Sequence, residues 1–285
     1  MREIADGVFF EDAYASGNVG CVMTTEGAVI IDAPMLPEDA WDWLKQNASR
    51  LKQGLLALIN TDGSLERVLG NGFFPPCTTI AHQSAWQEMQ HYDQAFLQRQ
   101  AARLRAEGIG DSADLNHLRI VPPELTMTTS MTLHKGDREL RLLYGGGHSS
   151  SSIMVHLPKE RILFTGNILV CGEHPALAQA TTAKWLSALE MIHGMPDVEA
   201  IVPGSGGICD QRATETLATY ILQMRERVEE FYNNGYTRRE TVDRVKMEDY
   251  FPIPETRRND IERRVRGSVE RVYDELKRGS PKKHP

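Results

Sequence analysis

Residues 59–71 read Ile-Asn-Thr-Asp-Gly-Ser-Leu-Glu-Arg-Val-Leu-Gly-Asn, and this stretch decides which fold the chain is expected to adopt. The apolar run Leu55–Ile59 leads into it and is short enough for a buried strand. Polar or charged side chains then follow at close spacing: Asp62, Ser64, Glu66 and Arg67. This cluster makes the loop after the strand the first candidate for a functional site.

Three further segments combine glycines with one polar residue near the end of an expected strand. They are Tyr-Gly-Gly-Gly-His-Ser at 144–149, Leu-Phe-Thr-Gly-Asn at 163–167 and Val-Pro-Gly-Ser-Gly at 202–206. Each segment alone is a weak signal, because glycine-rich and Pro-Gly turns are common. Four segments in a fixed order along one chain are a much stronger signal.

In that order, the segments resemble the metal-binding motifs of the metallo-β-lactamase superfamily. The family has Asn-Thr-His-x-His-x-Asp-His after a buried strand and Gly-Asn a few residues later. Here Asn60, Thr61, Gly70 and Asn71 are kept. The family's other motifs are Gly-x-Gly-His-Thr, Leu-Phe-x-Gly-Asp and Val-Pro-Gly-His-Gly. The resemblance spans residues 60–206, or from about residue 8 with the flanking strands. It implies an α/β fold, the four-layer αββα sandwich.

The resemblance leaves one of the family's seven metal ligands in place, His148. The other ligand positions hold Asp62, Ser64, Glu66, Arg67, Asn167 and Ser205. Zinc prefers four ligands from Cys, His, Asp and Glu, so neither half of the family's dinuclear centre is credible here. We therefore expect no metal ligand set and no cofactor.

Arg67 strengthens that expectation because its guanidinium cannot lose its charge. Two unit charges about 4 Å apart interact by roughly 4 kcal/mol at an effective dielectric of about 20, and a dication doubles the repulsion. A cation at the second metal position therefore excludes a metal ion or replaces it. We expect Arg67 to form an ion pair with Asp62 or Glu66 across the former site.

The replacements are polar, which favours a repurposed site, because buried unpaired polar groups cost roughly 1–3 kcal/mol each. Ligands of one zinc lie close together, so Asp62, Ser64 and His148 are expected to converge, and they are the residue types of a Ser-His-Asp triad. His148 is the candidate general base, and Ser64 is a candidate nucleophile or orienting group. Glu66 is a further candidate catalytic carboxylate, and Arg67 would stabilise a developing anion.

The candidate substrate-binding residues are Asn167, Ser205, Arg67 and Cys171, and the expected partner is a small polar or anionic molecule that undergoes a hydrolase- or lyase-type reaction. Two alternatives stay open. The chain can be a non-catalytic pseudoenzyme that acts as a binding or interaction protein. It can also be a hydrolase in which Asp62, Glu66 and His148 loosely hold one Mg²⁺ or Mn²⁺, which requires Arg67 to point away.

Composition narrows the partners and the compartment. The formal charge is -7, from 32 basic and 39 acidic residues, which disfavours nucleic acid. The basic residues Lys282 and Lys283 are too few to change this. Four cysteines in no paired spacing indicate reduced thiols and a cytoplasmic protein. We expect neither a signal peptide nor a membrane partner, because the chain lacks an apolar leader and a run of about 18 apolar residues.

Strand and helix patterns alternate over residues 1–210, with a long helix expected from His82 to about Glu107 and a loop over Ile109–Pro123. Residues 211–235 and 254–278 are charged and helical, and we interpret residues 211–285 as a helical C-terminal extension packed on the main domain. Its apolar stripes are typical of core-facing helix sides, whereas an exposed stripe would support a homodimer. The stripe residues are Leu217, Ile221, Met224 and Val228, then Val265, Val269, Val272 and Leu276.

Overall fold

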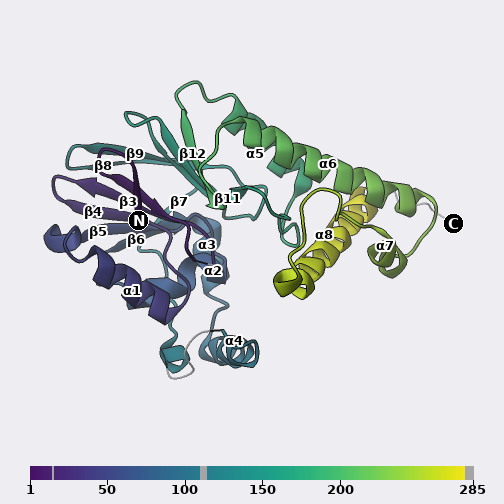
Figure 1. Ribbon diagram of the computed structural model, residues 1–285, viewed down its shortest axis with the longest axis horizontal. Helices are drawn as coiled ribbons and strands as arrows, with labels where there is room; N and C mark the ends of the chain where they lie inside the picture. Colours follow the sequence, from purple (N-terminus) through teal and green to yellow (C-terminus); the bar gives the residue numbers. More distant parts are fainter. Residues whose placement is uncertain (15, 110–113, 280–285) are drawn as a thin grey trace.

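The computed structural model of the chain describes residues 1–14, 16–109 and 114–279. Within these ranges, two β-sheets pack face to face and helices cover both outer faces (Figure 1). The predicted four-layer αββα sandwich is therefore confirmed. A group of C-terminal helices extends from one side of the sandwich, as Figure 1 shows.

The first sheet has seven strands, and their spatial order follows the chain. They are β1 (Arg2–Ala5), β2 (Val8–Glu11), β3 (Val19–Thr24), β4 (Gly27–Ile31), β5 (Leu55–Ile59), β6 (Thr78–His82) and β7 (Leu125–Met127). Strands β1 to β4 pair antiparallel, and β4 to β7 pair parallel. The functional loop of residues 59–71 begins at the carboxyl end of β5, which is central among the parallel strands.

The second sheet has five strands in the order β12-β11-β10-β9-β8. They are β8 (Ser130–Lys135), β9 (Arg138–Tyr144), β10 (Ile153–Leu157), β11 (Ile162–Val170) and β12 (Ala200–Ser205). The β8–β9 and β10–β11 pairs are antiparallel hairpins. The Gly-His, Gly-Asn and Pro-Gly-Ser segments therefore lie at the end of β9, inside β11 and inside β12.

The helices form the outer layers. They are α1 (Pro37–Asn47), α2 (Leu65–Val68), α3 (Gln83–Met89), α4 (Gln94–Ala106), α5 (Thr182–His193), α6 (Arg212–Asn233), α7 (Arg238–Arg244) and α8 (Arg258–Gly279). Helix α1 packs Trp43 on the first sheet, and α5, α6 and α8 share a core cluster with the second sheet around Trp185. No helix in the described ranges is long and apolar enough to cross a membrane.

The long helix expected from His82 to Glu107 is wrong as a single element. His82 ends β6, and the helical region is interrupted between Met89 and Gln94. The side chain of Asp93 accepts a hydrogen bond from the Phe96 backbone N–H (2.7 Å) and so caps a new helix, α4. Part of the expected loop at 109–123 lies outside the described residues, and the strands β1 and β7 and the helix α7 were not predicted.

The apolar stripes of the C-terminal helices are buried within the chain itself. Leu217, Ile221, Met224 and Val228 of α6 are at most 3% exposed, and Val269 and Val272 of α8 are at most 1% exposed. The core-facing interpretation is confirmed, and the stripes do not form an exposed dimer surface. The basic residues Lys282 and Lys283 lie outside the described residues.

Candidate functional site

The residues kept from the family motif hold the loop of residues 59–71 in shape. The amide side chains of Asn60 and Asn71 donate to each other's oxygens (3.1 and 2.7 Å), and Asn60 also donates to the Arg67 carbonyl (2.7 Å). Gly70 passes the Pro34 carbonyl so closely that a Cβ would lie 1.8 Å from its oxygen. These contacts are independent of any metal, which explains why the frame persists without the ligands.

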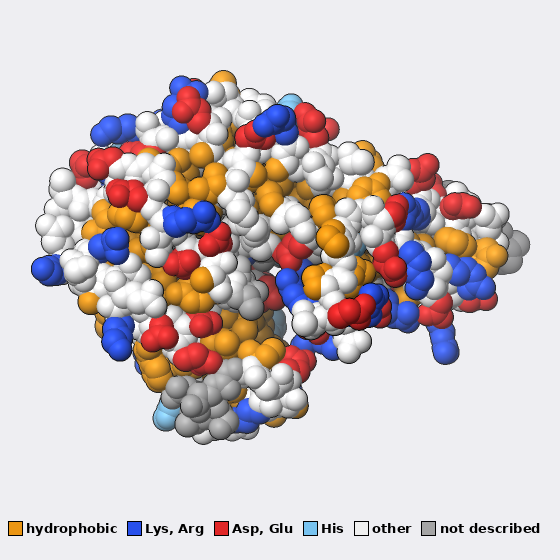
Figure 2. Space-filling model, viewed as in Figure 1, with side chains coloured by type: hydrophobic (Ala, Val, Ile, Leu, Met, Phe, Trp, Pro, Cys, Tyr) orange, Lys and Arg blue, Asp and Glu red, His pale blue; other side chains and the backbone are white. Residues whose placement is uncertain are grey.

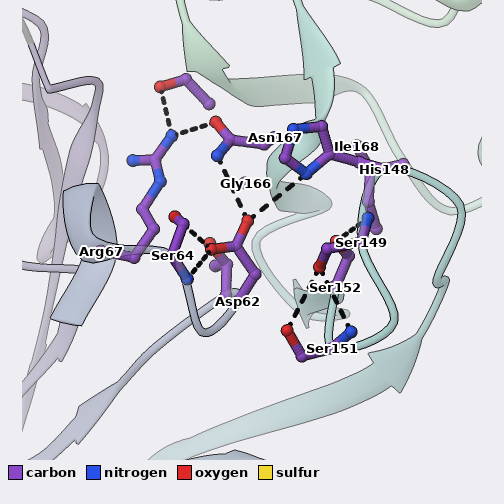
Figure 3. Close-up of polar contacts among 12 residues, drawn as sticks. Asp62, Ser64, Arg67, His148, Ser149, Ser151, Ser152, Gly166, Asn167 and Ile168 are labelled. Carbon is purple, nitrogen blue, oxygen red and sulfur yellow. Dashed lines mark hydrogen bonds and ion pairs between the residues drawn. The ribbon is translucent and has the colours of Figure 1, made fainter. Parts of the chain in front are cut away.

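Asp62 is the centre of the site (Figure 3). Its Oδ1 accepts hydrogen bonds from the Ser64 hydroxyl (2.6 Å) and backbone N–H (2.9 Å), and its Oδ2 accepts one from the Asn167 amide (3.2 Å). His148 Nδ1 lies 3.6 Å from the same Oδ2. The predicted convergence of Asp62, Ser64 and His148 is therefore present, with Asn167 added.

The order of these contacts differs from a Ser-His-Asp triad. The Ser64 hydroxyl donates to Asp62 and not to the imidazole, so the carboxylate lies between the serine and the histidine. Serine is too short to reach across the space that a histidine ligand would span. Ser64 is therefore placed to orient Asp62 and is not placed to be deprotonated by His148.

His148 is a neutral, nearly buried imidazole. Its side chain is 12% exposed and meets Trp185 edge to face, with ring centroids 5.2 Å apart. Nδ1 has no hydrogen-bond partner in the described part of the chain. Burial lowers the pKa of His148; the Asp62 carboxylate opposes this, and the cations Arg67 and Arg264 act in the same direction as burial. The ring is thus able to accept a proton at neutral pH.

Arg67 lies at the second metal position, but its partner is not the one expected. The side chain is 2% exposed and forms its ion pair with Asp32 (3.5 Å), a carboxylate at the end of β4. It also donates to the Asn167 side-chain oxygen and to the carbonyls of Gly204 (2.9 Å) and Asn18 (3.1 Å). The predicted ion pair with Asp62 or Glu66 is therefore wrong.

The reason is that Asp32 is deeper and already fixed. Its two oxygens accept hydrogen bonds from the Thr61 backbone N–H (2.8 Å) and hydroxyl (2.6 Å), so it stands beside the loop in one orientation. Burial raises the pKa of Asp32 to about 6, and Arg67 and Thr61 oppose the rise. A buried guanidinium needs such a counter-charge.

A cavity of about 390 Å³ lies beside these residues, between the sandwich and the C-terminal helices; Asp62, Ser64 and Asp32 are not among the residues that line it. Glu66, Arg67, His148, Asn167, Ser205 and Cys171 all line it, as the sequence predicted for a shared site. The Glu66 side chain is exposed within the cavity. The protein atoms around its carboxyl replace part of the water that would stabilise the negative charge, and this desolvation raises the pKa of Glu66. A hydrogen bond with Cys209 lowers the pKa of the Cys171 thiol.

The sequence of the chain is similar to those of known proteins. No protein-family model matches the chain. It is 23% identical to the acyl-coenzyme A thioesterase MBLAC2 of Bos taurus over 221 residues, which cover 71% of this chain and 79% of that protein. It is 31% identical to the metallo-beta-lactamase type 2 of Bacteroides fragilis over 117 residues, 39% of this chain and 46% of that protein.

The structural likeness is broader. A metallo-beta-lactamase family protein from Thermus thermophilus aligns with 96% of this chain and 95% of its own, with a TM-score of 0.69 and 15% identity. The chain therefore has the metallo-β-lactamase fold, and its sequence is similar to proteins of that superfamily. At that coverage the shared fold includes most of the C-terminal helices.

The dinuclear zinc centre that the resemblance implies does not fit the residues of this chain. In the described ranges, no group of three or more His, Cys, Asp or Glu side chains is placed to hold a metal ion. At the bridging position, the Asn167 amide nitrogen faces Asp62 and its oxygen accepts from Arg67, so the oxygen that would bind metal already has a cationic donor. The Mg²⁺ or Mn²⁺ alternative requires Arg67 to point away, and Arg67 points inward.

Several residues of the cavity were missed by the sequence analysis. Asp32, which pairs with Arg67 behind the cavity wall, was not among the predicted site residues. Arg257 and Arg264, from the C-terminal helices, and Glu173, which pairs with both, line the cavity opposite the loop of residues 59–71. No local sequence signal marks these arginines among the many charges of their helices; only the tertiary fold brings them to the site.

Proposed function

We propose that this chain binds a small anionic molecule in the cavity and transforms it by general acid–base chemistry that does not use the family's zinc centre. The observation that carries the proposal is the His148–Asp62 pair, a neutral imidazole backed by a carboxylate at the wall of a cavity that also contains cations. Perturbed titratable groups in a cleft favour a functional site over a purely structural one.

Each residue has a defined part in this proposal. His148 accepts a proton from a bound water or from the substrate, and Asp62 holds the ring and stabilises the imidazolium that forms. Ser64 and Asn167 hold Asp62 in place through its two oxygens. Arg67 supplies a fixed positive field next to the position where negative charge develops. When the water attacks, its proton goes to His148 and then to the leaving group.

The length of the His148–Asp62 contact is consistent with a site that tightens around its substrate. At 3.6 Å the two atoms are beyond the usual hydrogen-bond range. Catalytic hydrogen bonds are often long before substrate binds and shorten in the complex. The contact should shorten when a ligand closes the cavity.

The named relatives supply the first substrates to test. The full-length chain, treated with EDTA, is assayed against an acyl-coenzyme A thioester and a β-lactam. We expect turnover of at least one substrate, unchanged by EDTA or added zinc, and a loss of about 10²–10⁴-fold in His148→Gln, the usual contribution of a general base. His134→Gln, in an exposed position on β8, is the matched control and should keep full activity. Activity that appears only with zinc, or that His148→Gln retains, contradicts the proposal.

A non-catalytic binding protein is the second candidate, and one observation favours it. The hydroxyl of Ser64 donates to Asp62, so Ser64 is not activated as a nucleophile by His148. A pseudoenzyme would bind a ligand without changing it. Tight ligand binding by the wild-type chain, with the bound molecule recovered chemically unaltered after prolonged incubation, would favour this second function.

A further inference from the structure

The wall of the cavity opposite His148 carries its own group of charges, contributed by the C-terminal helices. Arg264 of α8 and Arg257 of the short helical turn Glu255–Arg257 both face Glu173. Arg264 Nη1 lies 3.4 Å from Glu173 Oε2, and Arg257 Nη2 lies 3.7 Å from the same oxygen. In the surface view, charged side chains gather over these helices (Figure 2).

The two arginines are only partly satisfied by this carboxylate. Both ion-pair distances exceed the 2.7–3.2 Å of an N–H···O hydrogen bond, so Glu173 attracts the guanidinium groups without saturating their donors. Its other oxygen, Oε1, accepts from Ser205, at the former metal-ligand position. Both guanidinium groups therefore share one oxygen of one carboxylate, and Arg264 Nη1 also donates to the His174 carbonyl (3.0 Å).

The geometry of the group suits an oxyanion. A guanidinium presents several N–H donors in a planar fork, and carboxylate and phosphate groups bind such forks through two oxygens. The side chains of Arg257 and Arg264 are 50% and 29% exposed, so an incoming ligand can reach them. Glu173 is itself a carboxylate between the two forks and so resembles the ligand that they would bind.

We propose that Arg257 and Arg264 form the oxyanion-binding end of the cavity and that Glu173 is an internal competitor, which the carboxylate or phosphate group of a ligand displaces. This proposal adds the ligand class to the proposed function. It rests on the proposed function for one point only, the orientation of the rest of the ligand in the cavity. The ligand carries a terminal oxyanion at the α8 end and its reacting bond at the His148 end.

Displacement of Glu173 also has a consequence for the former metal site. The Ser205 hydroxyl, now donating to Glu173, becomes free to donate to the ligand. One ligand oxyanion can therefore take over the partners that Glu173 holds, without exposing an unpaired arginine in the cavity. This exchange keeps the charge of the arginine pair balanced both before and after binding.

The test is equilibrium binding of inorganic phosphate and of acetate to the full-length chain, measured by calorimetry at fixed ionic strength. Glu173→Gln removes the competitor and should bind the oxyanion about tenfold more tightly than wild type, equal to about 1.4 kcal/mol. Arg257→Gln and Arg264→Gln should each weaken binding at least about tenfold. Stronger binding of phosphate assigns a doubly charged head group, and stronger binding of acetate assigns a carboxylate; either result supports the site.

Arg266→Gln is the matched control, because it makes the same charge change on the same helix at a residue that pairs with Asp243 and does not line the cavity. Arg257→Gln should fold normally, because the Arg257 side chain is 50% exposed and its ion pair is with Glu173. Weaker binding by this variant therefore reports on the site and not on misfolding. The inference is overturned if Glu173→Gln binds no more tightly than wild type, or if Arg266→Gln weakens binding as much as Arg257→Gln. His148→Gln should bind the oxyanion normally, so loss of turnover with retained binding separates this inference from the proposed function.

Discussion

Arg67 is a buried cation whose two terminal guanidinium nitrogens have partners, whereas its Nε has no hydrogen-bond partner in the described part of the chain. Three acceptors and one carboxylate surround its guanidinium, from the β2–β3 loop, β4, β11 and β12. The loop can approach so closely because residue 17 is glycine; a Cβ there would lie 2.8 Å from the Arg67 guanidinium nitrogens and 2.4 Å from the Gly204 oxygen. The guanidinium thus joins both sheets at the position where the resemblance to the metallo-β-lactamase superfamily implies a metal ion.

Removing this cation should be costly to stability. Arg67→Ala leaves Asp32 as a buried carboxylate without its counter-charge, and breaking a buried pair in this way typically costs about 3–5 kcal/mol. The free energy of unfolding from urea denaturation measures the loss. Arg141→Ala, which breaks an exposed pair with Glu139, should cost less than about 1 kcal/mol.

A double variant protects this prediction against simple misfolding. Asp32→Asn combined with Arg67→Met removes both buried charges and should be more stable than Arg67→Ala alone, because no unpaired charge remains. If the free-energy losses of the two single substitutions instead add in full, so that the double variant is less stable than Arg67→Ala, the account of Arg67 as the partner of Asp32 is contradicted.

His148 makes a prediction about pH. Its pKa is lowered in the folded chain, so the unfolded chain takes up a proton at a higher pH than the folded one does. The contribution of His148 to stability is complete above about pH 6.5 and is lost as the pH falls toward its folded pKa. His148→Gln should therefore show a weaker loss of stability than wild type between pH 7.5 and pH 5.5, measured by urea unfolding at both pH values.

Comparing the two chains isolates this contribution. Asp32, whose pKa is raised, acts in the opposite direction, because its contribution is lost as the pH rises through about 6. Asp32 is present in both chains, so its effect cancels in the difference. An equal pH dependence of wild type and His148→Gln would mean that the imidazole is not held neutral by its surroundings.

At the scale of elements, the sequence predicts well what depends on local periodicity. The strands that carry the motifs, both hairpins of the second sheet and the long helices α5, α6 and α8 follow from alternation, apolar runs and stripes. The division between α3 and α4 was missed, because the helical pattern continues across it. The break depends on the cap at Asp93, which periodicity does not register.

Helix α8 is fixed to the cavity wall through one buried hydroxyl. Ser268 is fully buried; it accepts from the Leu177 backbone N–H (3.0 Å) and donates to the Arg264 carbonyl (2.8 Å). Ser268→Ala leaves the buried Leu177 N–H without its partner and should cost about 1–3 kcal/mol. Thermal unfolding of Ser268→Ala measures this loss.

The matched control is Ser187→Ala, because the exposed Ser187 hydroxyl donates only within its own helix to Ala183 (3.3 Å). Hydrogen exchange of the Leu177 amide should be faster in Ser268→Ala and unchanged in Ser187→Ala. Equal thermal stability of Ser268→Ala and wild type would show that α8 is held without this hydroxyl, by apolar packing and by its other polar contacts, such as the hydrogen bonds from Thr182 to Glu275.

At the scale of the whole molecule, the candidate site divides into a part that sequence can predict and a part that it cannot. The motif positions Asp62, His148 and Asn167 meet as expected, because Asp62 and His148 follow strands and Asn167 lies within one, and the fold fixes these strands next to each other. The partner of Arg67 was not predictable, since Asp32 comes from another strand. Arg257 and Arg264 were not predictable either, because their position depends on how the C-terminal helices dock.

That docking is extensive enough to make one folding unit. Apolar residues of α6 and α8 share one buried cluster with α5 and the second sheet. We expect a chain of residues 1–210 to expose Trp185 and its neighbours and to fail to fold. Circular dichroism and binding of a hydrophobic dye measure this. A chain ending at Gly279 is the control and should fold normally, whereas a stable, native-like chain of residues 1–210 would contradict the shared core.

The most direct test of the account is the zinc content of the full-length chain after equilibration with zinc and removal of loosely bound ions by dialysis. Because Arg67 and Asn167 leave no ligand set of the kind that zinc requires, we predict fewer than about 0.1 zinc ions per chain. One or two zinc ions per chain, retained after dialysis and lost in His148→Gln, would contradict the account.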